Sequence, residues 1–187
     1  MTIARTICVG FLALIVVGTL LLMMPFATVS GGWNSFIVAL FTSTSAVCVT
    51  GLAVVDTGSD FSFWGQLTIL LLIQVGGLGY MMTTTFLILL LGRKSDLRQK
   101  FAIQESFDRP FLQGSNSLVR SIIATTMIFE ITGIFLLLRT FVREFGWSTG
   151  IWYSVFHSIS AWNNAGFSLF SDSLVGYRSS WSVNLII

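Results

Sequence analysis

Charged residues are scarce in this sequence. Only 10% of its 187 residues are Asp, Glu, Lys or Arg, whereas soluble globular domains carry about 25%. Hydrophobic residues make up 54% of the chain, and its mean hydropathy is +0.85. Because a soluble domain of this length would need more charge on its surface, the composition predicts an integral membrane protein surrounded by lipid, with no nucleic-acid partner.

Cysteine and histidine are also few, with two and one residues respectively. Cys8 and Cys48 stand in separate apolar stretches, which predicts two buried thiols rather than a disulfide framework or a metal site. The sequence contains no CxxC, HExxH or GxSxG motif, and His157 has no acidic residue nearby. We therefore expect neither an enzyme nor a cofactor, and we interpret His157 as a structural, hydrogen-bonded residue.

Three long apolar segments are candidates for membrane-spanning helices: residues 6–24, 64–91 and 121–138. A helix needs about 20 such residues to cross a bilayer. The first segment follows Arg5 and could instead be a secretory signal peptide. It is longer than the usual apolar region of about 7–15 residues, however, and Pro25 follows it directly. We therefore expect an all-α membrane protein that crosses the membrane several times.

Basic residues concentrate between the second and third apolar segments. Residues 93–120 hold six of the ten Lys and Arg residues, whereas residues 25–63 hold none. By the positive-inside rule, the 93–120 loop and the N-terminus are cytoplasmic, and residues 25–63 lie on the outer side of the cell (plasma or inner) membrane. A charged loop of this kind is usually only solvated, although it could also dock a cytoplasmic partner.

The stretch 32–56, on the predicted outer side, has the composition of a re-entrant segment. It begins with an apolar, helix-like run from Trp33 to Phe41, passes through small and hydroxyl residues, and ends in Val47-Cys48-Val49-Thr50-Gly51. A short helix that enters the bilayer partway and returns through non-helical backbone has this pattern. Such backbone is tolerated at membrane depth only where it is buried in protein or lines a water-filled cavity. The stretch therefore predicts a pore loop.

The same pattern occurs again in residues 149–170. An offset of 115 residues aligns Phe41, Ser43, Ser45, Ala46 and Gly51 with Phe156, Ser158, Ser160, Ala161 and Gly166. Each unit is then a helix, a re-entrant pore loop and a helix. The first unit covers residues 1–92, a cytoplasmic connecting loop covers 93–120, and the second unit covers 121–187, where its last helix is cut short. Two spanning helices separate the loops, so both loops lie on one side and the repeats are parallel.

The predicted loops are suited to a cation. A short helix that ends at a loop directs its negative end toward that loop, and loop carbonyl oxygens can replace an ion's hydration shell. No carboxylate lies within residues 47–51 or 163–166, where the two loops carry their glycines, which favours a monovalent cation over a hard divalent one. Gly51 and Gly166 stand where the chain must approach an ion or adopt a positive φ.

Two further features have competing interpretations. The Gly76-Gly77-Leu78-Gly79 cluster lies inside an apolar run, without the strand that a nucleotide-binding glycine loop follows. Close helix packing or a local bend is predicted instead. Glu130 lies within the third spanning segment, where an ionisable group is costly. It could be protonated, paired with an arginine of another helix, or part of an ion pathway.

These residues carry a resemblance to a known family. STSAVCVTGL, followed by WGQLTILLLIQVGGLGYM and later by HSISAWNNAGFSLF, resembles the first two pore units of the TrkH/KtrB/HKT superfamily of potassium transporters, above all its bacterial KtrB-type subunit. The resemblance implies a potassium-channel-like fold in which four units surround one pore. It also implies a selectivity filter to which this chain contributes Val49, Thr50, Gly51, Asn164, Ala165 and Gly166. A glycine, rather than a serine, at the first filter position implies preference for potassium over sodium.

The resemblance also implies partners. Potassium would be the transported ion, with sodium as the coupling ion in many KtrB-type systems. The subunit would form a homodimer on a cytoplasmic ring of nucleotide-binding regulatory subunits. This chain holds about one and a half of the expected four units. We therefore expect either a fragment of a longer product or two copies that complete one pore. The alternative function is a non-conducting membrane interaction protein, whose apolar segments are simply packed helices.

Overall fold

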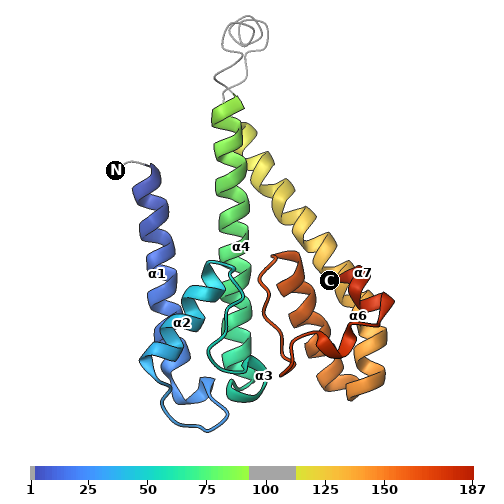
Figure 1. The fold of residues 1–187 in the computed structure, drawn as a ribbon. Coiled ribbons are helices and arrows are strands. Elements are labelled where there is room, and N and C mark those ends of the chain that lie inside the picture. The colour runs from blue at the N-terminus through green and yellow to red at the C-terminus, as the bar shows by residue number, and fades with distance from the viewer. Residues whose placement is uncertain (1–2, 93–112) are drawn as a thin grey trace, which may run out of the picture. The chain divides into compact units, whose positions relative to one another are not determined.

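The computed structural model describes residues 3–92 and 113–187, which form helices joined by short loops (Figure 1). In chain order the helices are α1 (Ile3–Met23), η1 (Pro25–Ala27), α2 (Phe36–Val47), α3 (Thr57–Asp60), α4 (Phe63–Gly92), α6 (Gln113–Trp162), η3 (Val175–Tyr177) and α7 (Trp181–Ile186). Within these ranges, β pairing is limited to one isolated bridge between Thr28 and Phe61. The all-helical expectation is therefore confirmed.

Two helix boundaries differ from the expected ones. α2 begins at Phe36 and continues through the small and hydroxyl residues as far as Val47. α6 begins at Gln113 rather than near Ser121, because polar residues extend this helix beyond its apolar part. Residues 113–120 of the expected connecting segment 93–120 are therefore helical. Its residues 93–112 lie outside the described residues.

α6 consists of two helical parts joined at Gly146. This residue has φ 78° and ψ 175°, a conformation that interrupts the helix and that residues with a Cβ rarely adopt. A Cβ built there would meet no atom within 4 Å, so the backbone turn, and not crowding, requires glycine. Residues 113–145 form the long first part. Residues 147–162 form a short second part that leads into the second predicted loop.

The chain divides into two compact units, Met1–Gly77 with Phe129–Ile187, and Leu78–Ile128. The first unit contains the main hydrophobic core, where α1 packs along α2 (Figure 1). Its largest fully buried members are Leu22, Phe61, Ile69, Ile73 and Phe156. In the second unit, the described residues are the last turns of α4 and the first turns of α6.

Large apolar side chains also cover outward faces of the first unit. Val9 and Leu12 of α1, and Ile131 and Phe135 of α6, are each about half or more exposed. Among the residues whose side chains are described, one helix, Val119–Trp162, is long and apolar enough to cross a membrane by length and composition. An apolar surface of this extent suits contact with lipid or with further protein.

Both cysteines are exposed, so the prediction of two buried thiols is wrong. Cys8 lies in α1, and Cys48 is the C-cap of α2. An apolar stretch in the sequence does not distinguish a residue in the core from one on an apolar outer surface.

Candidate functional site

The first predicted pore loop begins with a regular helix-ending turn. After α2, the Val49 N–H donates to the Ala46 carbonyl (3.3 Å) and the Thr50 N–H donates to the Ser45 carbonyl (3.0 Å). Val49 has φ 56°, in the left-handed region. Two such hydrogen bonds around a left-handed residue form a Schellman motif, which satisfies the last carbonyl groups of a helix.

The second loop repeats this turn at the same offset of 115 residues. The Asn164 N–H donates to the Ala161 carbonyl (2.9 Å), and the Ala165 N–H donates to the Ser160 carbonyl (2.7 Å). Asn164 has φ 55°. Asparagine adopts this conformation with little penalty, whereas for a β-branched residue such as Val49 it is a genuine outlier. The loop geometry, and not residue preference, therefore holds Val49 in place.

The two loops meet at their glycines. Gly51 has φ 71° and Gly166 has φ 73°. A Cβ built on Gly51 would lie 2.6 Å from the Ala165 carbonyl oxygen and 2.9 Å from the Gly166 Cα, whereas a Cβ built on Gly166 would lie 3.2 Å from the Gly51 Cα. Both positions thus require glycine for their φ, and Gly51 also for its close approach to the other loop. The residues that the repeat pairs in sequence are therefore neighbours in space.

The short helices are anchored to the long ones by matching hydrogen bonds. The Ser43 hydroxyl of α2 donates to the Ile15 carbonyl of α1 (2.9 Å). The Ser158 hydroxyl, in the second part of α6, donates to the Glu130 carbonyl in the first part (2.8 Å). The two acceptors are also 115 residues apart, so the repeat extends from the loops into the long helices.

A glycine lies beside each of these serines. A Cβ built on Gly18 would clash with the Ser43 hydroxyl oxygen, and a Cβ built on Gly133 would clash with the Ser158 hydroxyl oxygen. The residue patterns that paired the two loops did not reveal this pair of glycines. Extending the 115-residue comparison toward the N-terminus would have found them.

Gly76 and Gly77 of the α4 glycine cluster serve close packing, one of the two roles expected of the cluster. A Cβ on Gly76 would collide with the Val47 carbonyl at the end of α2, and a Cβ on Gly77 would collide with the Asn163 side chain. Both short helices therefore end against adjacent residues of α4. Small residues permit such close approach between helix backbones.

Glu130 lies in a network of amides. Its side chain is 4% exposed, and its Oε1 accepts a hydrogen bond from Asn163 Nδ2 (3.3 Å). Gln74 Oε1 of α4 accepts from the same Asn163 Nδ2 (3.2 Å). The described contacts of this carboxyl group are thus with uncharged side chains rather than with an arginine.

His157 holds the segment that follows the second loop. Its Nδ1 donates to the Tyr153 carbonyl (2.8 Å), which leaves Nε2 as an acceptor. Nε2 faces the Ser168 hydroxyl (3.1 Å) and accepts from the Leu169 N–H (3.3 Å). The expected structural, hydrogen-bonded role of His157 is confirmed.

The oxygen atoms available for a cation at the two loops are mainly backbone carbonyls. Within the described residues, no group of three or more His, Cys, Asp and Glu could hold a metal ion. The loop hydroxyls bond locally: Thr50 Oγ1 donates to Ser45 Oγ (3.0 Å), and Ser160 Oγ donates to the Phe167 carbonyl (2.7 Å). Carbonyl oxygens near the negative ends of two helices form a chemically suitable environment for a monovalent cation.

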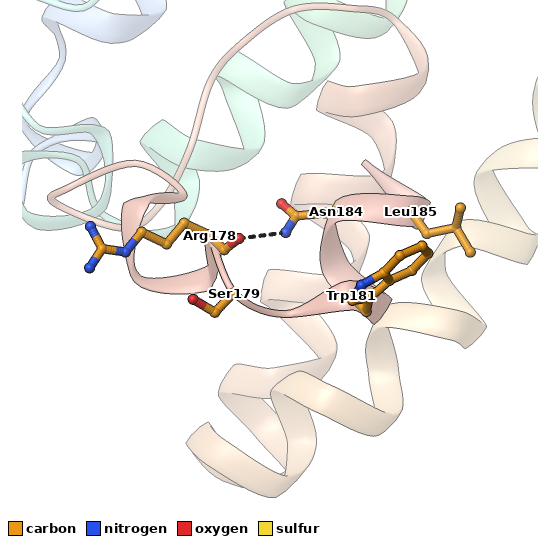
Figure 2. Close-up of a pocket in the computed structure, with 5 residues that line it drawn as sticks. All are labelled: Arg178, Ser179, Trp181, Asn184 and Leu185. Carbon is orange, nitrogen blue, oxygen red and sulfur yellow. Dashed lines mark hydrogen bonds between the residues drawn. The ribbon is translucent and has the colours of Figure 1, made fainter.

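Two pockets differ in their relation to these loops. A pocket of about 200 Å³ adjoins the second loop, with Asn164 and Gly166 in its lining. A pocket of about 430 Å³ is lined by Arg178, Ser179, Trp181, Asn184 and Leu185 (Figure 2). In this second pocket Asn184 Nδ2 donates to the Arg178 carbonyl (3.0 Å), and Trp181 is 84% exposed. None of the predicted site residues lines it.

Comparison with known proteins gives consistent matches. Residues 4–187 match the profile of the TrkH family, described as cation transport protein. The chain is 42% identical over 183 residues to the Ktr system potassium uptake protein B of Bacillus subtilis, and 41% identical over 173 residues to the protein of that name from Vibrio alginolyticus. It is 36% identical over 183 residues to the potassium/sodium uptake protein NtpJ of Enterococcus hirae. These alignments include 92–98% of this chain but 38–41% of each relative, so the chain spans about two fifths of their length.

Proposed function

Since this chain belongs to the TrkH family of cation transport proteins, we propose that it lines part of a pore for potassium uptake. The family acts in membranes and transports cations, so the chain is part of a transporter and not of an enzyme. The names of three relatives identify them as potassium uptake or potassium/sodium uptake proteins. Potassium is accordingly the cargo proposed here, and not a resident cofactor.

The approach of Gly51 to Gly166 is the observation that carries this proposal. Two loops of matching backbone geometry present glycines with φ near 70° to one another. We assign the filter to Val49, Thr50 and Gly51 of the first loop and to Asn164, Ala165 and Gly166 of the second. Their carbonyl oxygens replace the hydration shell of the passing ion. Further loops of the same type complete the ring around it.

The proposed membrane arrangement follows the distribution of charge. Residues 1–92 and 121–187 are parallel units of helix, re-entrant loop and helix, and both loops open to the outer side of the cell membrane. The N-terminus and the basic segment 93–120 are cytoplasmic. The proposed partners are a second copy of the subunit and a cytoplasmic ring of nucleotide-binding regulatory subunits, with sodium as the coupling ion.

A complementation experiment tests the proposed function. The whole coding sequence is expressed in a bacterial strain that lacks its own potassium uptake systems. We expect growth at low external potassium and saturable potassium uptake, both dependent on the expressed protein. Absence of uptake, with the protein present in the membrane at normal abundance, would contradict the proposal and favour a non-conducting membrane interaction protein.

Labelling of Cys48 gives an independent test of the loop arrangement. In a Cys8→Ser variant, Cys48 is the one thiol of this 187-residue chain, and Cys48 is exposed at the start of the first loop. We expect a membrane-impermeant thiol reagent added outside the cell to label it in the intact protein, because the loop opens to the outer side. A Cys48→Ser variant is the matched control, and labelling only after the membrane is permeabilised would overturn the proposed orientation.

A further inference from the structure

The second loop has a side-chain brace at its first residue. Asn163 Nδ2 lies within hydrogen-bonding distance of Gln74 Oε1 in α4 (3.2 Å) and of Glu130 Oε1 in the first part of α6 (3.3 Å). It also donates to the Ile159 carbonyl in the short helix that Asn163 follows (2.9 Å). One amide thereby links the end of the short helix to both long helices around it.

The brace is buried and closely fitted. Asn163 is 6% exposed, and its Oδ1 has no hydrogen-bond partner among the described residues. This oxygen lies against the backbone of Gly77, where a Cβ would collide with it. Because Asn163 Oδ1 is a buried acceptor without a partner, the Asn163 side chain is held by the hydrogen bonds of its Nδ2 and by packing. Its position therefore depends on Gln74 and Glu130.

The first loop lacks this brace. The residue at the position of Asn163 is Cys48, 115 residues earlier, and its side chain is exposed. The residue at the position of Glu130 is Ile15, which supplies the same type of carbonyl acceptor but no polar side chain. The backbone turns of the two loops match, so the difference lies in the side chains that hold them.

We propose that Asn163 is a positioning residue that sets the second filter loop, and that Glu130 serves it as a hydrogen-bond acceptor rather than as a charge in the ion path. This inference rests on the proposed function. Asn163 immediately precedes Asn164, whose left-handed conformation directs the chain toward Gly166. A shift of Asn163 against α4 therefore moves the carbonyl oxygens assigned to the filter.

The test compares matched positions of the two loops in the full-length protein. Asn163→Leu keeps the approximate side-chain size but removes the donors, and Cys48→Ala is the control at the equivalent position. Uptake per molecule and the preference for potassium over sodium are measured at equal membrane abundance. We expect Asn163→Leu to reduce the preference for potassium over sodium about tenfold, because a tenfold change in selectivity corresponds to only a small loss of coordination energy. Cys48→Ala should preserve this preference.

Variants of Glu130 separate its two possible roles. Glu130→Gln keeps an acceptor oxygen without the charge, whereas Glu130→Leu removes both. We expect Glu130→Leu to reproduce the loss of selectivity, and the double variant with Asn163→Leu to be no worse than either alone, because residues in one network are not additive. Glu130→Gln should retain most of the selectivity. An equal loss in Glu130→Gln and Glu130→Leu would show that the charge itself is required and would overturn this assignment.

Failure of this inference is distinguishable from failure of the proposed function. If the unaltered protein transports no potassium, the proposed function fails. If it transports potassium and Asn163→Leu keeps the selectivity of Cys48→Ala, only the positioning role fails. Should Asn163→Leu not accumulate in the membrane, Gln74→Leu breaks the same network from α4 and decides the question by the same selectivity measurement.

Discussion

Comparison of Gly51→Ala with Gly31→Ala separates two demands on Gly51, namely its positive φ and its close approach to the second loop. Gly51 has φ 71°, and a Cβ there would lie 2.6 Å from the Ala165 carbonyl oxygen. Gly31 provides the matched control, because it has φ 68° but nothing within 4 Å of a built Cβ. Gly31→Ala thus carries the conformational cost alone, and Gly51→Ala carries the same cost together with a collision between the loops.

The conformational cost and the collision between the loops affect different properties of the protein. A left-handed conformation costs a residue with a Cβ roughly 1–2 kcal/mol, which changes a folded-to-unfolded ratio by about 5–30-fold. Both variants bear this cost as lower stability. In Gly51→Ala, the 2.6 Å separation must also widen to an ordinary carbon–oxygen contact of about 3.3 Å, so the loops must move apart by roughly 0.7 Å. A loss of only about 1.4 kcal/mol in ion coordination then weakens binding about tenfold.

The assay measures potassium uptake per molecule and its competition by sodium, in the full-length protein expressed in a strain without other potassium uptake. We expect Gly31→Ala to reduce membrane abundance but to leave uptake per molecule and selectivity unchanged. Gly51→Ala should reduce uptake per molecule by about tenfold or more at matched abundance. Equal uptake per molecule and equal selectivity in the two variants would refute the assignment of Gly51 to the filter.

Two further predictions concern stability, measured as the melting temperature of the purified protein in detergent. Gly18→Ala forces a Cβ against the Ser43 hydroxyl and should cost roughly 1–3 kcal/mol as an overpacked contact. Gly10→Ala in the same helix meets no atom within 4 Å and should be neutral or slightly stabilising; equal destabilisation by both would contradict the anchoring role. The pKa of Tyr177 is raised, mainly by burial and secondly by the hydrogen bond that the Tyr177 hydroxyl donates to Glu144 (2.6 Å). Its stabilising contribution is therefore present below the ordinary tyrosine pKa of about 10 and is lost as the pH rises above it. Tyr177→Phe should flatten that alkaline decline, and an unchanged pH profile would contradict this assignment.

The repeat was predictable because the residues that align between the two stretches are of types that few other positions accept. Phe41 to Ala46 aligns with Phe156 to Ala161, and the same offset carries Gly51 onto Gly166. Helix and loop geometry then follow, since a glycine after a short helix marks a turn with positive φ. A break between the spanning segment 121–138 and the stretch 149–170 was expected, but its position at Gly146 was not predicted, because one glycine between two apolar helical segments does not reveal where the chain bends.

The side-chain environment was less predictable than the backbone. Asn163 and Gln74 are 89 residues apart and meet only because the end of α6 lies against α4 at Gly77. No local pattern in the sequence specifies that contact. Cys8 was expected to be buried because its surroundings are apolar, yet an apolar helix in a membrane has no polar face that marks its outside. Its exposure therefore depends on packing that the sequence pattern does not encode.

The two halves of the repeat agree most closely where the backbone itself makes the contact or the turn. Ile15 and Glu130 differ in polarity, yet each supplies the carbonyl that anchors a short helix. Cys48 and Asn163 differ in the same way, although the backbone of each continues into the same turn. Side chains at matched positions are thus free to differ while the loops keep one geometry. The differences that lie beside the loops are consequently the places where two units of the proposed pore can acquire unequal roles, and the Asn163 brace is such a difference.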